Sequence, residues 1–225
     1  MLDSGNYGIL RTDGKLDTSS VTITASFLAK LASITSFLTI VTVYIIGAST
    51  SPLPFWPLST ISVYGSTLPA AYFFRAGFIT TGNLIVLLAM SMKKRRNFKC
   101  NYVLLLVGGF CLLSCAAISC AENNNVHSTF AIFFFLLVGI FQLSVAFKLN
   151  QMKVLTIKQK KLKHTATFAG TYVVTEILIV ILMGIGVLDL PKHIILPSFE
   201  WSGVIVILFF LYYFGDYVGK ENIEC

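Results

Sequence analysis

Apolar residues gather in six blocks along the chain, each close to 20 residues long. Because an α-helix rises about 1.5 Å per residue, a block of this length crosses roughly 30 Å of hydrocarbon. The pattern therefore predicts an all-α fold, a polytopic integral membrane protein built as a six-transmembrane-helix bundle. The predicted spans are Lys30–Ala48, Tyr72–Met92, Asn101–Ala121, Ser128–Leu149, Thr165–Leu188 and Phe199–Val218.

The polar stretches between these blocks are short. The connector 49–71 carries no charge and holds four of the six prolines, a density that excludes a helix and favours a stiff, folded loop. Residues 1–21 are polar and lack the apolar core of a signal peptide, so we expect the first span to act as the insertion signal. We divide the chain into a polar tail (1–28), a membrane domain (29–220) and a short second tail (221–225).

Composition and charge placement support this picture. The chain is 56% hydrophobic and 12% charged, which is too little charged surface for a soluble domain. The net charge of +7 could suggest nucleic acid, but eleven of the 17 Lys and Arg residues lie in the connectors 93–99 and 148–163. This is the positive-inside pattern, which predicts both connectors and both termini in the cytosol and argues against nucleic acid as a partner.

The same topology gathers other polar residues at the opposite membrane face. Arg75 lies near the start of the second span, Glu122 and His127 flank the turn between the third and fourth, and Glu200 opens the sixth. An arginine, a histidine and two carboxylates at one boundary could bind a lipid phosphate and move a proton. The alternative, which composition alone favours, is that charges at helix ends simply mark the interface.

Glu176 differs from these residues because it lies near the middle of the fifth span. An ionised carboxylate there costs on the order of 3 kcal/mol, so we expect it to be protonated or paired. A role with a proton or substrate and a structural, hydrogen-bonded role both stay open. Cys111 and Cys115 share a helix face and fit small packing residues better than a metal site. No cofactor-binding motif is present, so neither metal nor cofactor is predicted.

Three stretches of the sequence resemble the Frag/DRAM/Sfk superfamily of six-span proteins, also described as CWH-like N-terminal domains. They are LSTISVYGSTLPAAYFFRAGF in the first outer loop, SCAENNNVHSTFAIFFF between the third and fourth spans, and FEW at the start of the sixth. The resemblance covers about residues 30–224. Within the superfamily the chain is most similar to the post-GPI-attachment to proteins factor 2 branch, because Arg75 follows the Pro–aromatic stretch and the last span runs into YYFGDYVGKENI. Glu176 has no counterpart in the family pattern.

The resemblance implies a role in remodelling the lipid of GPI anchors in the Golgi or endoplasmic reticulum, by reacylation of lyso-GPI. Arg75 would hold the inositol phosphate, since a guanidinium suits that geometry. His127 would accept the proton of the glycerol hydroxyl, with Glu122 or Glu200 orienting the imidazole. The further residues expected to contact the substrate are Trp56, Ser59, Ser62, Gly65 and Trp201. Whether such a protein is itself an acyltransferase stays open.

A second hypothesis has no catalysis. A DRAM-like or Sfk-like protein in the lysosomal or plasma membrane would regulate autophagy or phospholipid organisation, with Arg75, His127 and Glu200 forming a polar clamp between helices. In both cases the expected partner is membrane lipid, in the first case the lipid part of a GPI anchor, and the sequence names no protein partner. A transporter would rest mainly on Glu176, and the lack of a second mid-membrane charge weakens it.

Overall fold

The computed structural model describes residues 18–50, 59–93 and 101–218, and this part of the chain is almost entirely helical. The helices are α1 (Thr18–Thr50), α2 (Ile61–Tyr64), α3 (Ala70–Met92), α4 (Tyr102–Ala117), α5 (Asn124–Asn150), α6 (Ile157–Gly184) and α7 (Lys192–Val218). Five of them are long and apolar enough to cross a membrane, and α4 is a shorter apolar helix. The predicted all-α, multi-pass membrane fold is confirmed.

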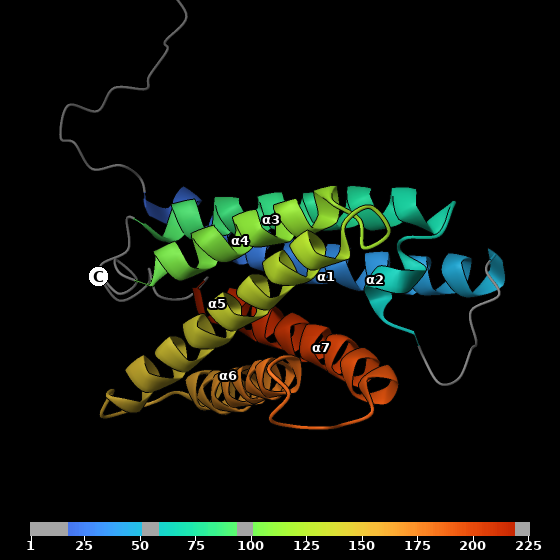
Figure 1. The fold of residues 1–225 in the computed structure, drawn as a ribbon. Coiled ribbons are helices and arrows are strands. Elements are labelled where there is room, and N and C mark those ends of the chain that lie inside the picture. Colours follow the sequence, from blue (N-terminus) through green and yellow to red (C-terminus); the bar gives the residue numbers. More distant parts are fainter. Residues whose placement is uncertain (1–17, 51–58, 94–100, 219–225) are drawn as a thin grey trace, which may run out of the picture.

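Apart from the one-turn α2, the helices form one bundle, in which α3 and α4 lie side by side (Figure 1). Neighbours pack most closely in the order α1, α3, α4, α5, α6, α7 and back to α1, and α5 also contacts α7 through the ring of Phe141. The start of α1 and the end of α7 meet at one end of the bundle, where Lys30 Nζ lies 2.5 Å from Asp216 Oδ1. Next to this pair, Gly215 lies against the backbone of Ser26. We call the opposite end, which holds α2 and the α4–α5 turn, the outer end, following the topology that the charge pattern predicts.

Helix α4 ends at Ala117, four residues before the predicted end of the third span. In a continuing helix the N–H of Ser119 would bond to the carbonyl of Cys115. Here that N–H donates to Glu122 Oε2 at 2.9 Å, and the Cys115 carbonyl lies 2.9 Å from Nδ1 of His127. Two polar side chains, Glu122 and His127, thus replace the helical bond. The predicted boundary was wrong because a hydropathy pattern contains no information on hydrogen bonds to side chains.

The prediction that the connector 49–71 excludes a helix was also wrong in part. The one-turn helix α2 forms after Pro57 and before Pro69, where no proline interrupts the backbone bonds. Thr60 caps it, because its hydroxyl accepts the N–H of Val63 at 3.2 Å. Tyr64 at its end is fully buried, and this side chain anchors α2 to the bundle.

All the longer helices except α4 start earlier than the predicted spans; α6, for example, begins at Ile157, eight residues before Thr165. Helix α7 begins at Lys192, seven residues before Phe199, and includes Pro197. Pro197 is the sixth residue of α7 and has no N–H, so the helix lacks the backbone bond to the carbonyl of His193. Helix α1 begins at Thr18, inside the predicted tail 1–28, although the part able to span the membrane starts at Ala25.

Candidate functional site

A chain of hydrogen bonds at the outer end joins three segments that are far apart in the sequence. Ser62 Oγ, from α2, lies 2.5 Å from Glu200 Oε1 of α7 and 2.9 Å from Nε2 of His127 in α5. The backbone N–H of Ser62 also donates to Glu200 Oε1, at 3.1 Å. His127 is buried, with 3% of its surface exposed. The fold therefore places a hydroxyl directly between an imidazole and a carboxyl group.

The other side of the imidazole fixes its tautomer. Nδ1 of His127 lies 2.9 Å from the carbonyl oxygen of Cys115 and 2.7 Å from that of Ile118. Carbonyl oxygens only accept, so Nδ1 carries a hydrogen. Two arrangements with the same number of protons then give each hydrogen bond between Glu200, Ser62 and His127 a donor and an acceptor. Either Glu200 is ionised and the imidazolium donates to Ser62, or Glu200 is protonated and Ser62 donates to a neutral Nε2. The two arrangements interconvert when protons are transferred through the Ser62 hydroxyl.

Arg75 and Glu122 form a separate pair at the rim of the outer end. An Arg75 Nη2 donates to Glu122 Oε1, and both side chains are partly exposed, at 39% and 53%. The hydrogen bond from the N–H of Ser119, followed by that from Arg75, holds the pKa of Glu122 below its ordinary value of 4.5. Nε of Arg75 is buried and has no hydrogen-bond partner among the residues that the structure describes. One donor of the guanidinium is therefore unused.

Glu176 of α6 lies on the same side of the bundle as the hydrogen-bonded chain. It is buried, with 5% of its surface exposed, and its Oε1 accepts from the hydroxyl of Ser202 at 3.0 Å. Tyr172 donates to the same Ser202 oxygen at 2.9 Å. Gly203 leaves room for the carboxyl group, since a Cβ there would lie 2.9 Å from Glu176 Oε2. The carboxyl group is thus hydrogen-bonded within the bundle, as one of the two open interpretations requires.

A cleft of about 420 Å³ lies between the hydrogen-bonded residues Ser62, His127 and Glu200 and the carboxyl group of Glu176. His127, Ser62 and Glu200 line it together with Glu176, and apolar side chains from α5, α6 and α7 form most of the rest of its wall. Arginine and lysine are missing from the lining that the structure describes. Its volume falls within the roughly 300–1,000 Å³ that is typical of small-molecule sites. Three of the predicted site residues, Ser62, His127 and Glu200, therefore share one space with the mid-span glutamate, whereas Arg75 and Glu122 do not line it.

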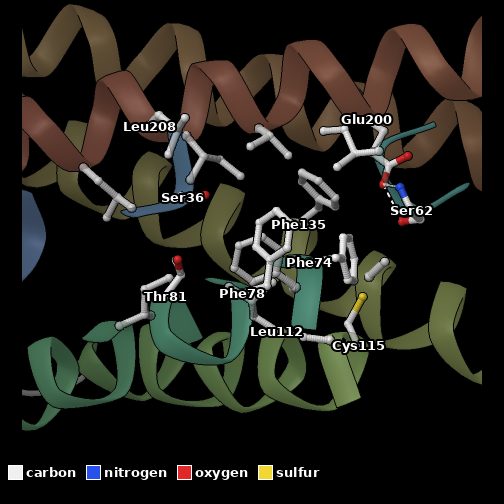
Figure 2. A pocket seen from close by; sticks show the side chains of 18 residues that line it. Ser36, Ser62, Phe74, Phe78, Thr81, Leu112, Cys115, Phe135, Glu200 and Leu208 are labelled. Atoms are coloured by element: carbon white, nitrogen blue, oxygen red, sulfur yellow. Dashed lines mark hydrogen bonds between the residues drawn. The ribbon is translucent and has the colours of Figure 1, made fainter. Parts of the chain in front are cut away.

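A second, narrow cavity of about 50 Å³ lies behind Ser62 and Glu200. Figure 2 shows these two residues joined at one end, Phe74, Phe78 and Phe135 in the middle, and polar side chains of α1 and α3 at the far end. An apolar cavity of roughly 150 Å³ in a protein core binds benzene. The narrow cavity is therefore too small for a ligand of that size, and the 420 Å³ cleft is the larger of the two spaces.

The remaining predicted residues support the loop that carries Ser62. The indole Nε1 of Trp201 donates to the carbonyl of Ser59 at 2.9 Å, and its ring meets those of Tyr44 and Tyr64 edge-on. Gly65 is buried, and a Cβ there would collide with the ring of Phe74. None of these three predicted contacts lines the cleft, and they hold α2 in place. Trp56 lies outside the described residues.

Sequence reasoning missed the residues that complete the site. The carbonyls of Cys115 and Ile118, which fix His127, carry no side-chain signal at all. Ser202 could have been found, because the pair Ser202–Gly203 lies in a span and small residues there mark close helix contact. Within the described ranges, no group of three or more His, Cys, Asp or Glu side chains could hold a metal ion.

Comparison with known proteins gives one match, to a family. The model of the Frag1/DRAM/Sfk1/Cwh43P N-terminal domain matches residues 24–216, which is most of the chain. The protein belongs to this family. No curated protein and no solved structure matches the chain. In this family member, the three stretches that carry the resemblance supply one residue each to the hydrogen-bonded chain: Ser62, His127 and Glu200. The family assignment does not depend on the post-GPI-attachment branch, which stays a proposal.

Proposed function

We propose that this protein transfers an acyl group to a lyso-lipid at the outer end of the bundle, and that the lipid is that of a GPI anchor in the Golgi or endoplasmic reticulum. The observation that carries the proposal is the chain from Glu200 through Ser62 to His127, which borders a cleft within membrane-spanning helices. Acyl transfer needs a hydroxyl to lose its proton beside an apolar space, and this arrangement provides both conditions.

His127 is the proton acceptor in this proposal. With Nδ1 protonated, the lone pair of the neutral imidazole is at Nε2, which faces Ser62 and the cleft. A base that is held in this way contributes typically 10²–10⁴-fold to the rate of a proton-transfer step. The orienting role that the sequence suggested for a carboxylate belongs in this proposal to two backbone carbonyls, because Glu200 reaches the imidazole only through Ser62.

Arg75 is the proposed phosphate ligand, and Glu122 is the group that a phosphate would replace. A guanidinium binds a phosphate through two parallel N–H bonds, and the buried Nε of Arg75 is a donor without a partner among the described residues. In this structure, the carboxylate of Glu122 accepts the hydrogen bond from Nη2. Because two anions repel each other at one cation, Glu122 would have to turn away as the lipid phosphate binds.

The proposal is tested by complementation in cells that lack the GPI remodelling factor, with surface retention of GPI-anchored proteins as the readout. Wild-type protein should restore retention, and His127→Ala should not. His193→Ala is the matched control, because it removes an exposed histidine at the outer end of α7. Restoration by His127→Ala to the wild-type level would show that the imidazole does not act as the base.

A second function is favoured by the same hydrogen bonds if they serve only to hold α2, α5 and α7 together. The protein would then regulate autophagy or phospholipid organisation, as proposed for a DRAM-like or Sfk-like member, without turnover. Localisation separates the two proposals. Residence in the lysosomal or plasma membrane, with no rescue of GPI-anchored proteins, would favour this second function over lipid remodelling.

A further inference from the structure

We propose that Ser62 is the nucleophile that carries the acyl group from the donor to the lyso-lipid, a step that rests on the proposed acyl transfer. The hydroxyl of Ser62 is the group that faces Nε2 of His127, at 2.9 Å. A lipid hydroxyl could donate to that lone pair only once the Ser62 hydroxyl no longer does. The group best placed to lose its proton to His127 is therefore a side chain of this protein.

The local geometry is that of an activated serine. A nucleophile within hydrogen-bond reach of a base, with the base held by a third group, is the general pattern of covalent catalysis. Here Ser62 is the nucleophile, His127 is the base, and the carbonyls of Cys115 and Ile118 hold the base at 2.9 and 2.7 Å. Glu200 accepts the backbone N–H of Ser62 and lies 2.5 Å from its Oγ, which fixes the nucleophile itself. When the Ser62 hydroxyl donates to His127, a protonated Glu200 donates to Oγ.

Ser62 is also accessible to a lipid. It is partly buried and lines the 420 Å³ cleft, together with apolar side chains of three membrane-spanning helices. An acyl chain lying among those side chains would bring its carbonyl carbon to the Ser62 hydroxyl at the polar end of the cleft. Phe135 lines both the cleft and the narrow cavity behind Ser62, and it forms part of the wall between them.

The reaction would take two balanced steps. In the first, Ser62 Oγ bonds to the carbonyl carbon of an acyl ester or thioester, and the bond from that carbon to the leaving oxygen or sulfur breaks. The Ser62 proton passes through Nε2 of His127 to the leaving group. In the second, the lyso-lipid hydroxyl gives its proton to Nε2 and bonds to the acyl carbon. The bond to Ser62 then breaks, and the proton returns to Ser62.

A long-chain alkyl fluorophosphonate tests the nucleophile without a known donor. Its phosphorus should bond to Ser62 Oγ with loss of fluoride, and peptide mapping of the purified full chain in detergent locates the label. Ser62→Ala should remove the label, and His127→Ala should slow labelling by about 100-fold or more. Ser66→Ala is the control, because its hydroxyl donates to the Val63 carbonyl at 2.8 Å and Ser66 is not among the residues that line the cleft.

A wild-type protein that takes no label at Ser62, or a His127→Ala variant that reacts at the wild-type rate, would overturn the proposal. Neither result depends on whether Ser62→Ala folds. The complementation assay separates this step from the proposed function. Rescue by Ser62→Ala as complete as by wild type overturns the nucleophile and leaves GPI remodelling in place. Labelling at Ser62 without rescue by wild type supports the nucleophile and removes the GPI substrate.

Discussion

Replacing Ser62 with alanine should destabilise the bundle by an amount that the structure allows us to work out. The change removes two hydrogen bonds, one to Glu200 Oε1 at 2.5 Å and one to Nε2 of His127 at 2.9 Å. The imidazole is 3% exposed, so an unpaired Nε2 costs about 1–3 kcal/mol. Glu200 keeps the backbone N–H of Ser62, and its lost bond costs about 1 kcal/mol. We therefore expect a loss of about 2–4 kcal/mol.

The assay is the free energy of unfolding in mixed micelles, compared for wild type, Ser62→Ala and Ser66→Ala. Ser66 lies in the same loop and donates to the Val63 carbonyl, so its removal should cost no more than about 1 kcal/mol. A loss below about 0.5 kcal/mol for Ser62→Ala, the size of an ordinary surface substitution, would refute the reasoning. It would mean that Ser62 does not hold His127 and Glu200 together.

Further predictions concern the cleft and the rim. Gly203→Ala should cost about 1–3 kcal/mol of stability in the same unfolding assay, because its Cβ would lie 2.9 Å from Glu176 Oε2. Gly184→Ala, which meets nothing within 4 Å, should change it by less than about 0.5 kcal/mol. The lowered pKa of Glu122 stabilises the fold above pH 4.5, and this contribution is lost as the pH falls through the folded-state pKa. Acid titration of stability should therefore be steeper for wild type than for Glu122→Gln, and equal slopes would contradict the pairing with Arg75.

The architecture could be predicted from the sequence because it depends on block length and on charge placement. Apolar blocks of span length leave few folds open in a membrane, since only helices satisfy every backbone group there. The meeting of His127 and Glu200 at one face followed from the alternating direction of the helices. Lys30 and Asp216 meet at the opposite end for the same reason.

The pairings within the site could not be predicted in the same way. Glu122 and Glu200 were equal candidates to orient His127, yet Glu122 bonds to Arg75 and Glu200 bonds to Ser62. The choice depends on where α4 ends and where α2 begins, and both are set by hydrogen bonds between distant segments. Hydropathy and local propensity predict neither of these helix ends. The hydrogen bonds that join Glu200, Ser62 and His127 were therefore visible only in the folded structure.

The most direct test of the account is stearate incorporation into lyso-GPI by membranes of remodelling-deficient cells that express this protein. Membranes with wild type or His193→Ala should incorporate labelled stearate at the same rate. Membranes with equal amounts of His127→Ala should incorporate none above the background of untransfected cells. Incorporation by His127→Ala at the wild-type rate would contradict the claim that the chain from Glu200 through Ser62 to His127 is a reaction centre.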